Sequence, residues 1–365
     1  MPNILTSRFL LGPGPSNCYP EVTAALAHPV IGHLDPLFIE RLDNTCEGLR
    51  TVWGTQNART LPLSATGSGG MEAAFVNTVD DGDVAVIAVN GLFGERMCEV
   101  ARRCGATVVR VDHDWGTPID VERVLTAHPR PKVIAAVHAE TSTGVLSDVA
   151  SLGQNKGDAL LIVDAVTSIG GLELLADDWG IDVGYAGTQK CLGVPPGLSP
   201  FTMSGRAFER RIENPRSWYL DVGLLGGYVG AASGSGRTYH HTPPVTMIAG
   251  LEAGLHRILA EGLDAVQARH RAAGAALQAG LQEMGLELFA AEGHRLPSLT
   301  TVKVPDGVDS AAVRRYLLEH FSIEIGSGAG SYASSIWRIG MMGPNANAAS
   351  VTLALGALKE AISAA

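Results

Sequence analysis

The sequence predicts an α/β fold: a large domain with a mostly parallel sheet flanked by helices, followed by a smaller α+β C-terminal domain. From about residue 60 to 205, short apolar runs alternate with helix-patterned segments, which is typical of buried parallel strands joined by crossover helices. After residue 245 the pattern changes to a long helix pair and then to short, separate strands and helices. At 365 residues the chain is long enough for one large or two moderate domains.

Six apolar runs are the predicted strands of the large sheet. They are VAVIAVN (84–90), TVVRVD (107–112), KVIAAVHAE (132–140), ALLIVDA (159–165), VGYAGTQK (183–190) and LSPFTMS (198–204). The segments between them repeat apolar residues at helical spacing, and several end in glycine. A helix pair is predicted at 245–284. We therefore divide the chain into an N-terminal segment (1–16), a large domain (17–256) and a small C-terminal domain (257–365).

Composition favours a small-molecule enzyme. Lys and Arg number 27 against 37 Asp and Glu, so the net charge is 27 − 37 = −10, and no long basic run offers a surface for nucleic acid or an anionic membrane. The five cysteines are scattered and form no CxxC pair, which argues against a disulfide framework and a zinc site, and we expect no metal. With no signal-like N-terminus and no long apolar stretch, we expect a cytoplasmic protein.

Lys190 is the first candidate for chemistry. It stands in YAGTQKCLGVPPG, between small residues and ahead of a turn, whereas the other four lysines occupy positions where a solvated ammonium is expected. Asp164 ends the apolar run of ALLIVDA, which places a carboxylate at the carboxyl edge of a strand, where open α/β sheets bind ligands. The two residues are 190 − 164 = 26 positions apart, so both side chains can reach one crevice from neighbouring strands.

A third feature is an expected anion site. Ser68, Gly69 and Gly70 stand at the start of a predicted helix, where free backbone N–H groups and the helix dipole attract an anion. An anion cradle, a buried carboxylate and an isolated lysine are what pyridoxal 5'-phosphate requires: a phosphate site, a partner for the pyridine nitrogen and an amine for the Schiff base. The alternative is a nucleotide- or nicotinamide-dependent α/β enzyme, although TGSGGMEAA departs from the GxGxxG spacing.

Nine ordered motifs carry a resemblance over nearly the whole chain. They are LLGPGPSN, GSGG with EAA, NGLFGER, HAETSTGV, VDAVTSIGG, GTQKCLGVPPG, YHHTPPV, IEIGSG and WRIGMMG. In these motifs the sequence resembles the class V, fold type I aminotransferases that use pyridoxal phosphate, specifically the alanine–glyoxylate and serine–glyoxylate (serine–pyruvate) group. The resemblance implies transamination of a small amino acid, alanine or serine, with glyoxylate or pyruvate as acceptor and ping-pong kinetics. Ureidoglycine–glyoxylate and pyridoxamine–pyruvate aminotransferases remain alternatives within it.

The resemblance also implies a role for residues around the cofactor ring. Lys190 forms the Schiff base and moves the substrate proton, and Asp164 pairs with the pyridine nitrogen. Phe93 in NGLFG takes the position of the aromatic residue that stacks on the ring, which is often Trp in this family. Thr141 matches the hydroxyl near the phenolic oxygen, and Val166 contacts the cofactor.

Further residues are implied for the phosphate and the substrate. Gln189 joins Ser68, Gly69 and Gly70 as a phosphate donor. Tyr239 and Thr242 of YHHT resemble the pair that reaches the phosphate from the neighbouring subunit, which implies that a homodimer shares its active sites. Arg338 in IWRIG matches the arginine that binds the substrate carboxylate. Independently, an arginine in an apolar strand is costly to bury unpaired, and its planar fork suits a carboxylate.

Overall fold

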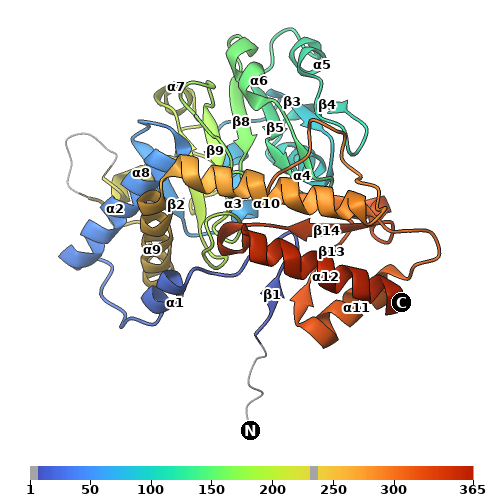
Figure 1. The fold of residues 1–365 in the computed structure, drawn as a ribbon. Helices are drawn as coiled ribbons and strands as arrows, with labels where there is room; N and C mark the ends of the chain where they lie inside the picture. The colour runs from blue at the N-terminus through green and yellow to red at the C-terminus, as the bar shows by residue number, and fades with distance from the viewer. Residues whose placement is uncertain (1–6, 231–236, 365) are drawn as a thin grey trace.

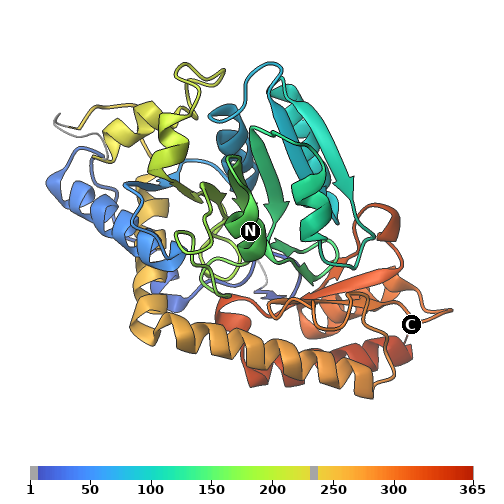
Figure 2. The ribbon, with the colours of Figure 1, turned by 90° about the horizontal axis from the view of Figure 1, so that it is seen from above.

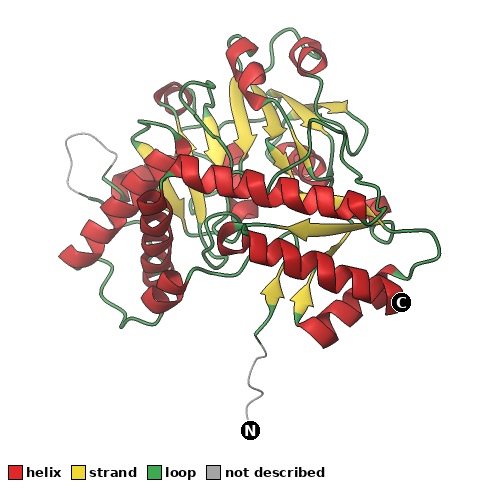
Figure 3. Ribbon diagram, viewed as in Figure 1, coloured by secondary structure: helices red, strands yellow, loops and turns green. Residues whose placement is uncertain are grey.

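The computed structural model describes residues 7–230 and 237–364. Its larger part is built around a seven-stranded sheet with helices packed against it (Figures 1 and 3). The strands lie in the order β2 (Arg59–Leu63), β10 (Ser199–Met203), β9 (Val183–Tyr185), β8 (Leu160–Asp164), β5 (Val133–Val137), β3 (Val84–Val89) and β4 (Thr107–Asp112). All neighbours from β9 to β4 pair in parallel, whereas β10 is antiparallel to both β9 and β2. The predicted mostly parallel sheet is confirmed.

The strand sequences explain the burial of the sheet. VAVIAV of β3, VIAAV of β5 and LLIVD of β8 are buried almost throughout, as expected for central strands covered on both faces. The predicted strand 183–190 is shorter in the structure: β9 ends at Tyr185, and the next residue, Ala186, still donates its N–H to the Pro200 carbonyl of β10 at 2.8 Å. Strand β2 was not predicted; its sequence RTLPL is short and contains a proline, which an edge strand tolerates.

Helices and short elements complete the large part. They are α1 (Pro20–Leu26), α2 (Pro36–Trp53), α3 (Gly67–Val76), α4 (Leu92–Arg103), α5 (Val121–Thr126), α6 (Val149–Asn155), α7 (Gly205–Glu209) and α8 (Val222–Tyr228), with the strand pair β6 (Ala139–Glu140) and β7 (Val145–Leu146). Helix α4 packs on β3, β4 and β5, and α3 packs on β9 and β10. Asp35 is the N-cap residue of α2 and accepts from the Leu37 N–H at 2.9 Å, and Gly54, in a left-handed conformation, is its C-cap residue.

The C-terminal part is a separate α+β layer (Figure 2). Its antiparallel sheet has the order β11 (Leu299–Lys303), β14 (Ile336–Gly340) and β13 (Gly326–Ser327), accompanied by α11 (Ser310–Phe321), α12 (Ala348–Ala364) and the short helices η1 (Gly330–Tyr332) and η2 (Gly343–Asn345). Strand β1 (Phe9–Leu10) pairs in parallel with β12 (Ile323–Glu324). The N-terminal segment, whose first six residues lie outside the described ranges, therefore joins this layer.

The predicted helix pair is present as α9 (Val245–Glu261) and α10 (Leu263–Glu283). Helix α10 lies along α12 in the view of Figure 1 and links two apolar cores. The core of the large part includes Val266 of α10, and the core of the C-terminal part starts at Ala273 of the same helix. The two cores thus change over within α10, and the predicted boundary at 256/257 stays a prediction. In the ranges described, none of the helices combines the length and apolarity needed to cross a bilayer.

Candidate active site

A cavity of about 150 Å³ brings together many of the predicted residues. Its lining consists of Thr66, Gly67, Ser68, Met71, Phe93, Arg96, Asp164, Val166, Gln189 and Lys190. It lies at the carboxyl ends of β8 and β9 and at the N-terminus of α3, the position at which parallel sheets bind ligands. A larger hollow of about 800 Å³ between α10 and α12 has no comparable set of groups: its lining includes Glu283 and Lys359 among mostly apolar residues.

Asp164 is the last residue of β8 and is 3% exposed. Its Oδ1 accepts a hydrogen bond from the Val166 N–H at 2.9 Å. Burial raises the pKa of this carboxyl to about 7, because the charged form loses its hydration. A cationic ring nitrogen beside Asp164 would restore the charged carboxylate, so this group fits a protonated pyridine.

Lys190 lies in the loop that follows β9 and is 8% exposed. Its Nζ donates to the Pro13 carbonyl, and the Lys190 carbonyl accepts from Ser16 Oγ at 2.8 Å. Residues of the N-terminal segment therefore hold both the side chain and the backbone of Lys190 in place. Burial, and then the positive charge of Arg338, lower its pKa to about 8. A fraction of the amine is therefore unprotonated near neutral pH, as a nucleophile requires.

The helix start that forms the anion cradle lies one residue earlier than the predicted Ser68. Helix α3 begins at Gly67 and has Thr66 as its N-cap residue, and both residues line the cavity together with Ser68. The Gly70 N–H donates a hydrogen bond to the Thr66 carbonyl at 3.1 Å. A Cβ at Gly70 would lie only 2.1 Å from Ser199 Oγ. Gly69 and Gly70 are not part of the cavity lining, and their contact with the phosphate stays a prediction. The N–H groups of the first turn, that of Gly69 included, have no acceptor within the helix, whereas the Gly70 N–H already has one.

Gln189 and Val166 complete this side of the cavity. A Cβ at Gly67 would lie 2.8 Å from Val166 Cγ2, so only glycine allows the helix start to approach the loop after β8. The Gln189 Oε1 atom is buried and has no hydrogen-bond partner within residues 7–230 and 237–364. A buried amide with unused capacity is a group that a ligand can satisfy.

Phe93 and Arg96 reach the cavity from the N-terminal part of α4. The start of this helix is held by a buried carboxylate: Glu140 accepts from the Phe93 N–H at 3.1 Å, and from the N–H and Oγ–H of Ser142 at 3.0 and 2.6 Å. Gly91, the N-cap residue, offers no side chain, and a Cβ there would lie 2.4 Å from Glu140 Cγ. Glu140 therefore replaces a local cap and fixes the position from which Phe93 faces the cavity.

Arg338 lies in β14 and approaches the site from the C-terminal part. Its Nε donates to the Ser327 carbonyl at 2.6 Å, and its Nη1 lies 3.4 Å from the Thr141 carbonyl. No carboxylate forms an ion pair with Arg338 in the described part of the chain. Its charge is thus available for a substrate carboxylate, and its role in binding one stays a prediction. Thr141 is buried next to it and lies outside the cavity lining.

Tyr239 and Thr242 lie on the surface, away from the cavity of their own chain. Tyr239 is 57% exposed, and its hydroxyl lies 3.4 Å from Thr242 Oγ1. Neither residue is part of the cavity lining. Their predicted contact with the phosphate of a neighbouring subunit stays a prediction.

Sequence reasoning missed five residues of this site: Thr66, Gly67, Met71, Arg96 and Glu140. Thr66 and Gly67 were within the quoted glycine turn, but the exact start of the helix was misplaced. Arg96 follows Phe93 by three positions on a predicted helix, which puts the two side chains on one face, and this spacing was a usable signal. Glu140 had no such signal, because its partners at α4 are more than forty positions away in sequence.

Comparison with known proteins agrees with this geometry. The family model for aminotransferase class V matches residues 16–348. An alanine–glyoxylate aminotransferase of Drosophila melanogaster is 41% identical over 99% of this chain and 94% of its own. Among solved structures, an alanine–glyoxylate aminotransferase from Nostoc sp. has a TM-score of 0.94 and 43% identity, covering 99% of this chain and 97% of its own. A ureidoglycine–glyoxylate aminotransferase from Bacillus subtilis has a TM-score of 0.95 and 37% identity, covering 100% and 95%. The chain belongs to the class V aminotransferases.

Proposed function

We propose that this chain transfers the amino group of alanine or serine to glyoxylate or pyruvate, using pyridoxal 5'-phosphate bound at Lys190. The observation that carries the proposal is the meeting of Lys190, Asp164 and the N-terminus of α3 in one cavity. Membership of the class V family implies this cofactor, and relatives named for alanine and glyoxylate support the substrates.

The residues of the cavity fit the cofactor. The first turn of α3 at Thr66 to Ser68 would hold the phosphate, because its N–H groups are free and the helix dipole favours an anion. Asp164 would pair with the ring nitrogen, Phe93 would stack on the ring, and the Gln189 amide has unused hydrogen-bonding capacity. When bound, pyridoxal phosphate supplies the carbonyl that accepts the amino group and an electron sink for the substrate.

Three side chains of the protein then bind the substrate, transfer its proton and keep the ring nitrogen protonated. Arg338 binds the substrate carboxylate through its free N–H groups and so orients the Cα–H bond. Lys190, whose pKa burial lowers to about 8, takes the proton from Cα as a general base and returns it as a general acid. Asp164 stays ionised only opposite a positive charge, so it keeps the ring nitrogen protonated. Two half-reactions through one site predict ping-pong kinetics.

Two alternatives use the same site. Ureidoglycine or pyridoxamine as the donor is chemically compatible with it, and the likeness to the Bacillus subtilis enzyme favours testing ureidoglycine. A nucleotide- or nicotinamide-dependent enzyme is less well supported, because it gives no role to a lysine and an aspartate that are both buried in the cavity.

We also propose that a homodimer is the catalytic unit and that the protein is cytoplasmic. Tyr239 and Thr242 are exposed near a group of exposed apolar side chains that includes Trp218 and Tyr219, and such patches are typical of protein interfaces. Mixing the inactive variants Lys190→Ala and Tyr239→Ala tests this idea. Recovery of activity in the mixture supports a shared site, because the mixed dimer has one intact site; no recovery argues against it.

An absorption titration tests the reaction. The purified protein with pyridoxal phosphate is expected to show a visible band that one donor among alanine, serine, ureidoglycine and pyridoxamine abolishes and glyoxylate restores. The Lys190→Ala variant is the control and should neither form the protein-linked band nor turn over. If the wild-type protein shows no band with pyridoxal phosphate, the proposed function is wrong and the nucleotide alternative moves forward.

A further inference from the structure

Arg96 occupies the phosphate end of the cavity without an assigned role. Its Nη1 donates to Ser68 Oγ at 3.1 Å, and its guanidinium carbon lies 5.1 Å from the centre of the Phe93 ring. Ser68, Phe93 and Arg96 all line the cavity that contains Asp164 and Lys190. Arg96 therefore links the aromatic ring on α4 to the first turn of α3.

Arg96 differs from its neighbouring arginines in being unpaired. Arg102 and Arg103 of the same helix both pair with Glu99, at 2.6 and 2.8 Å, and Arg110 pairs with Glu95 at 3.1 Å. Across residues 7–230 and 237–364, no carboxylate forms an ion pair with Arg96. A full positive charge is therefore left at the cavity.

The direction of the hydrogen bond prepares Ser68 for an anion. A guanidinium group has only donors, so Ser68 Oγ must accept from Arg96. The Ser68 O–H is then free to donate to a ligand oxygen, next to the free N–H groups of the first helical turn. Arg96 thus leaves the Ser68 hydroxyl free to donate and adds its own positive charge beside the first turn of α3.

The charge balance of the cradle requires such a group. A phosphate ester carries nearly two negative charges, whereas a helix N-terminus offers roughly half a positive charge. Gly67 and Gly70 have no room for a side chain that could add a cation, since a Cβ would meet Val166 at 2.8 Å and Ser199 at 2.1 Å. We propose that Arg96 binds the cofactor phosphate together with Ser68; this inference rests on the proposed function.

The test compares two ligands that differ only in the phosphate. Dissociation constants of pyridoxal phosphate and of pyridoxal are measured from the visible band for the cofactor-free wild-type protein and for Arg96→Gln. We expect Arg96→Gln to weaken pyridoxal phosphate binding about 10- to 100-fold, as for hydrogen bonds to charged groups, and to change pyridoxal binding less than about threefold. Inorganic phosphate should compete with pyridoxal phosphate less strongly in the variant than in the wild type.

Matched variants separate the possible results. Arg102→Gln removes a neighbouring surface charge that Glu99 already neutralises, and it should leave both constants unchanged. Arg96→Lys should recover part of the lost phosphate affinity, because it keeps the charge but loses the planar fork. If Arg96→Gln weakens both ligands equally or neither, the role of Arg96 is overturned while the proposed function stands. If the wild type binds neither ligand, the proposed function fails and this inference fails with it.

Discussion

Replacing Asp164 with asparagine is expected to stabilise the cofactor-free protein at neutral and alkaline pH. The side chain is 3% exposed, and burial raises its pKa from 3.8 to about 7. That difference corresponds to about 4 kcal/mol of free energy by which folding disfavours the charged carboxylate. Asparagine removes the charge but keeps an oxygen that can accept the Val166 N–H, so the local geometry is preserved.

The sign of the effect depends on pH. Between about pH 4 and pH 7 the folded protein holds a proton on Asp164 that the unfolded chain has released, so the wild type loses stability as the pH rises through this window. The Asp164→Asn variant has no carboxyl at this position, so its stability does not fall for this reason as the pH rises. The two proteins should be equally stable below about pH 4, and the variant should be more stable by up to about 4 kcal/mol above pH 7.

Urea unfolding of both cofactor-free proteins across this pH range measures the difference. Pyridoxal phosphate should then stabilise the wild type more than the variant, because a protonated ring nitrogen restores the charged form of Asp164 only in the wild type. Equal stability at every pH would refute the argument that burial penalises this carboxylate. An equal gain from the cofactor in both proteins would refute the pairing with the ring nitrogen.

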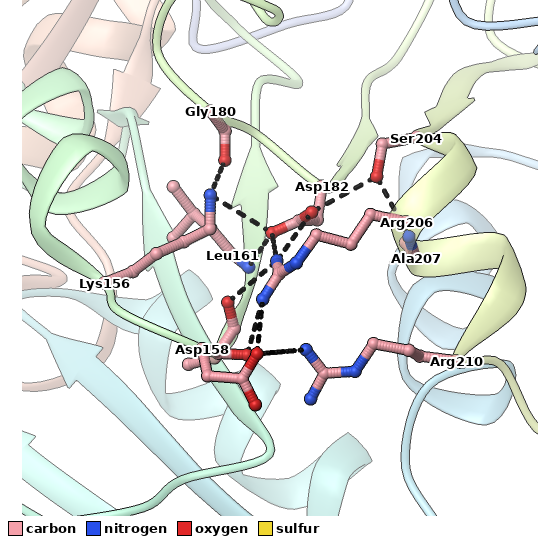
Figure 4. Close-up of polar contacts among 10 residues, drawn as sticks. Lys156, Asp158, Leu161, Gly180, Asp182, Ser204, Arg206, Ala207 and Arg210 are labelled. Carbon is pink, nitrogen blue, oxygen red and sulfur yellow. Dashed lines mark hydrogen bonds and ion pairs between the residues drawn. The ribbon is translucent and has the colours of Figure 1, made fainter.

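Three other changes test the fold and the substrate site. Asp182→Asn should lower the free energy of unfolding in urea by about 3 kcal/mol, because buried Asp182 pairs with Lys156 at 3.3 Å and with Arg206 at 2.9 Å (Figure 4). The control is Glu99→Gln at an exposed ion pair, which should lower it by under about 1 kcal/mol. A loss below 1 kcal/mol for Asp182→Asn would contradict this. Arg338→Gln should lower kcat/KM for the amino donor about 10- to 100-fold and leave pyridoxal phosphate affinity unchanged; unchanged kinetics would remove Arg338 from the site. Trp337→Ala, at a fully buried position, should cost about 3–5 kcal/mol in the same unfolding assay, and a smaller loss would mean that the core refills the cavity.

The sequence predicted the elements whose burial leaves a local pattern. Strands β3, β5 and β8 are buried on both faces, so their apolar runs are continuous and their positions are readable. Strand β2 has a proline and lies at the sheet edge, where partners distant in sequence decide whether a strand forms. The change from one apolar core to the other lies inside α10, a helix whose pattern is uninterrupted, so no local signal in the sequence marks it.

The residues of the site likewise fall into those that have a local sequence signal and those that are defined by contacts between distant segments. Asp164 was a candidate because a charged residue that ends an apolar strand is unusual, and Lys190 because it stands between small residues ahead of a turn. The start of α3 was misplaced because several glycines in a row allow more than one helix start, and only packing against Val166 and Ser199 selects Gly67. Contacts such as that between Glu140 and the start of α4 join distant segments, so no local pattern could reveal them.

The two buried carboxylates of the site show how the fold reserves one of them for a ligand. Burial raises the pKa of both Glu140 and Asp164. Glu140 accepts from the Phe93 N–H and from the N–H and Oγ–H of Ser142, so its oxygens are satisfied by the protein and its work is to hold α4. Asp164 differs from Glu140 in lining the cavity, where the Val166 N–H and the nearby Tyr185 hydroxyl are its partners in the protein. A buried carboxylate that lines a cavity and has a raised pKa favours a ligand that brings a cationic N–H. Asp164 is therefore poised for the cofactor ring, whereas Glu140 is committed to the protein.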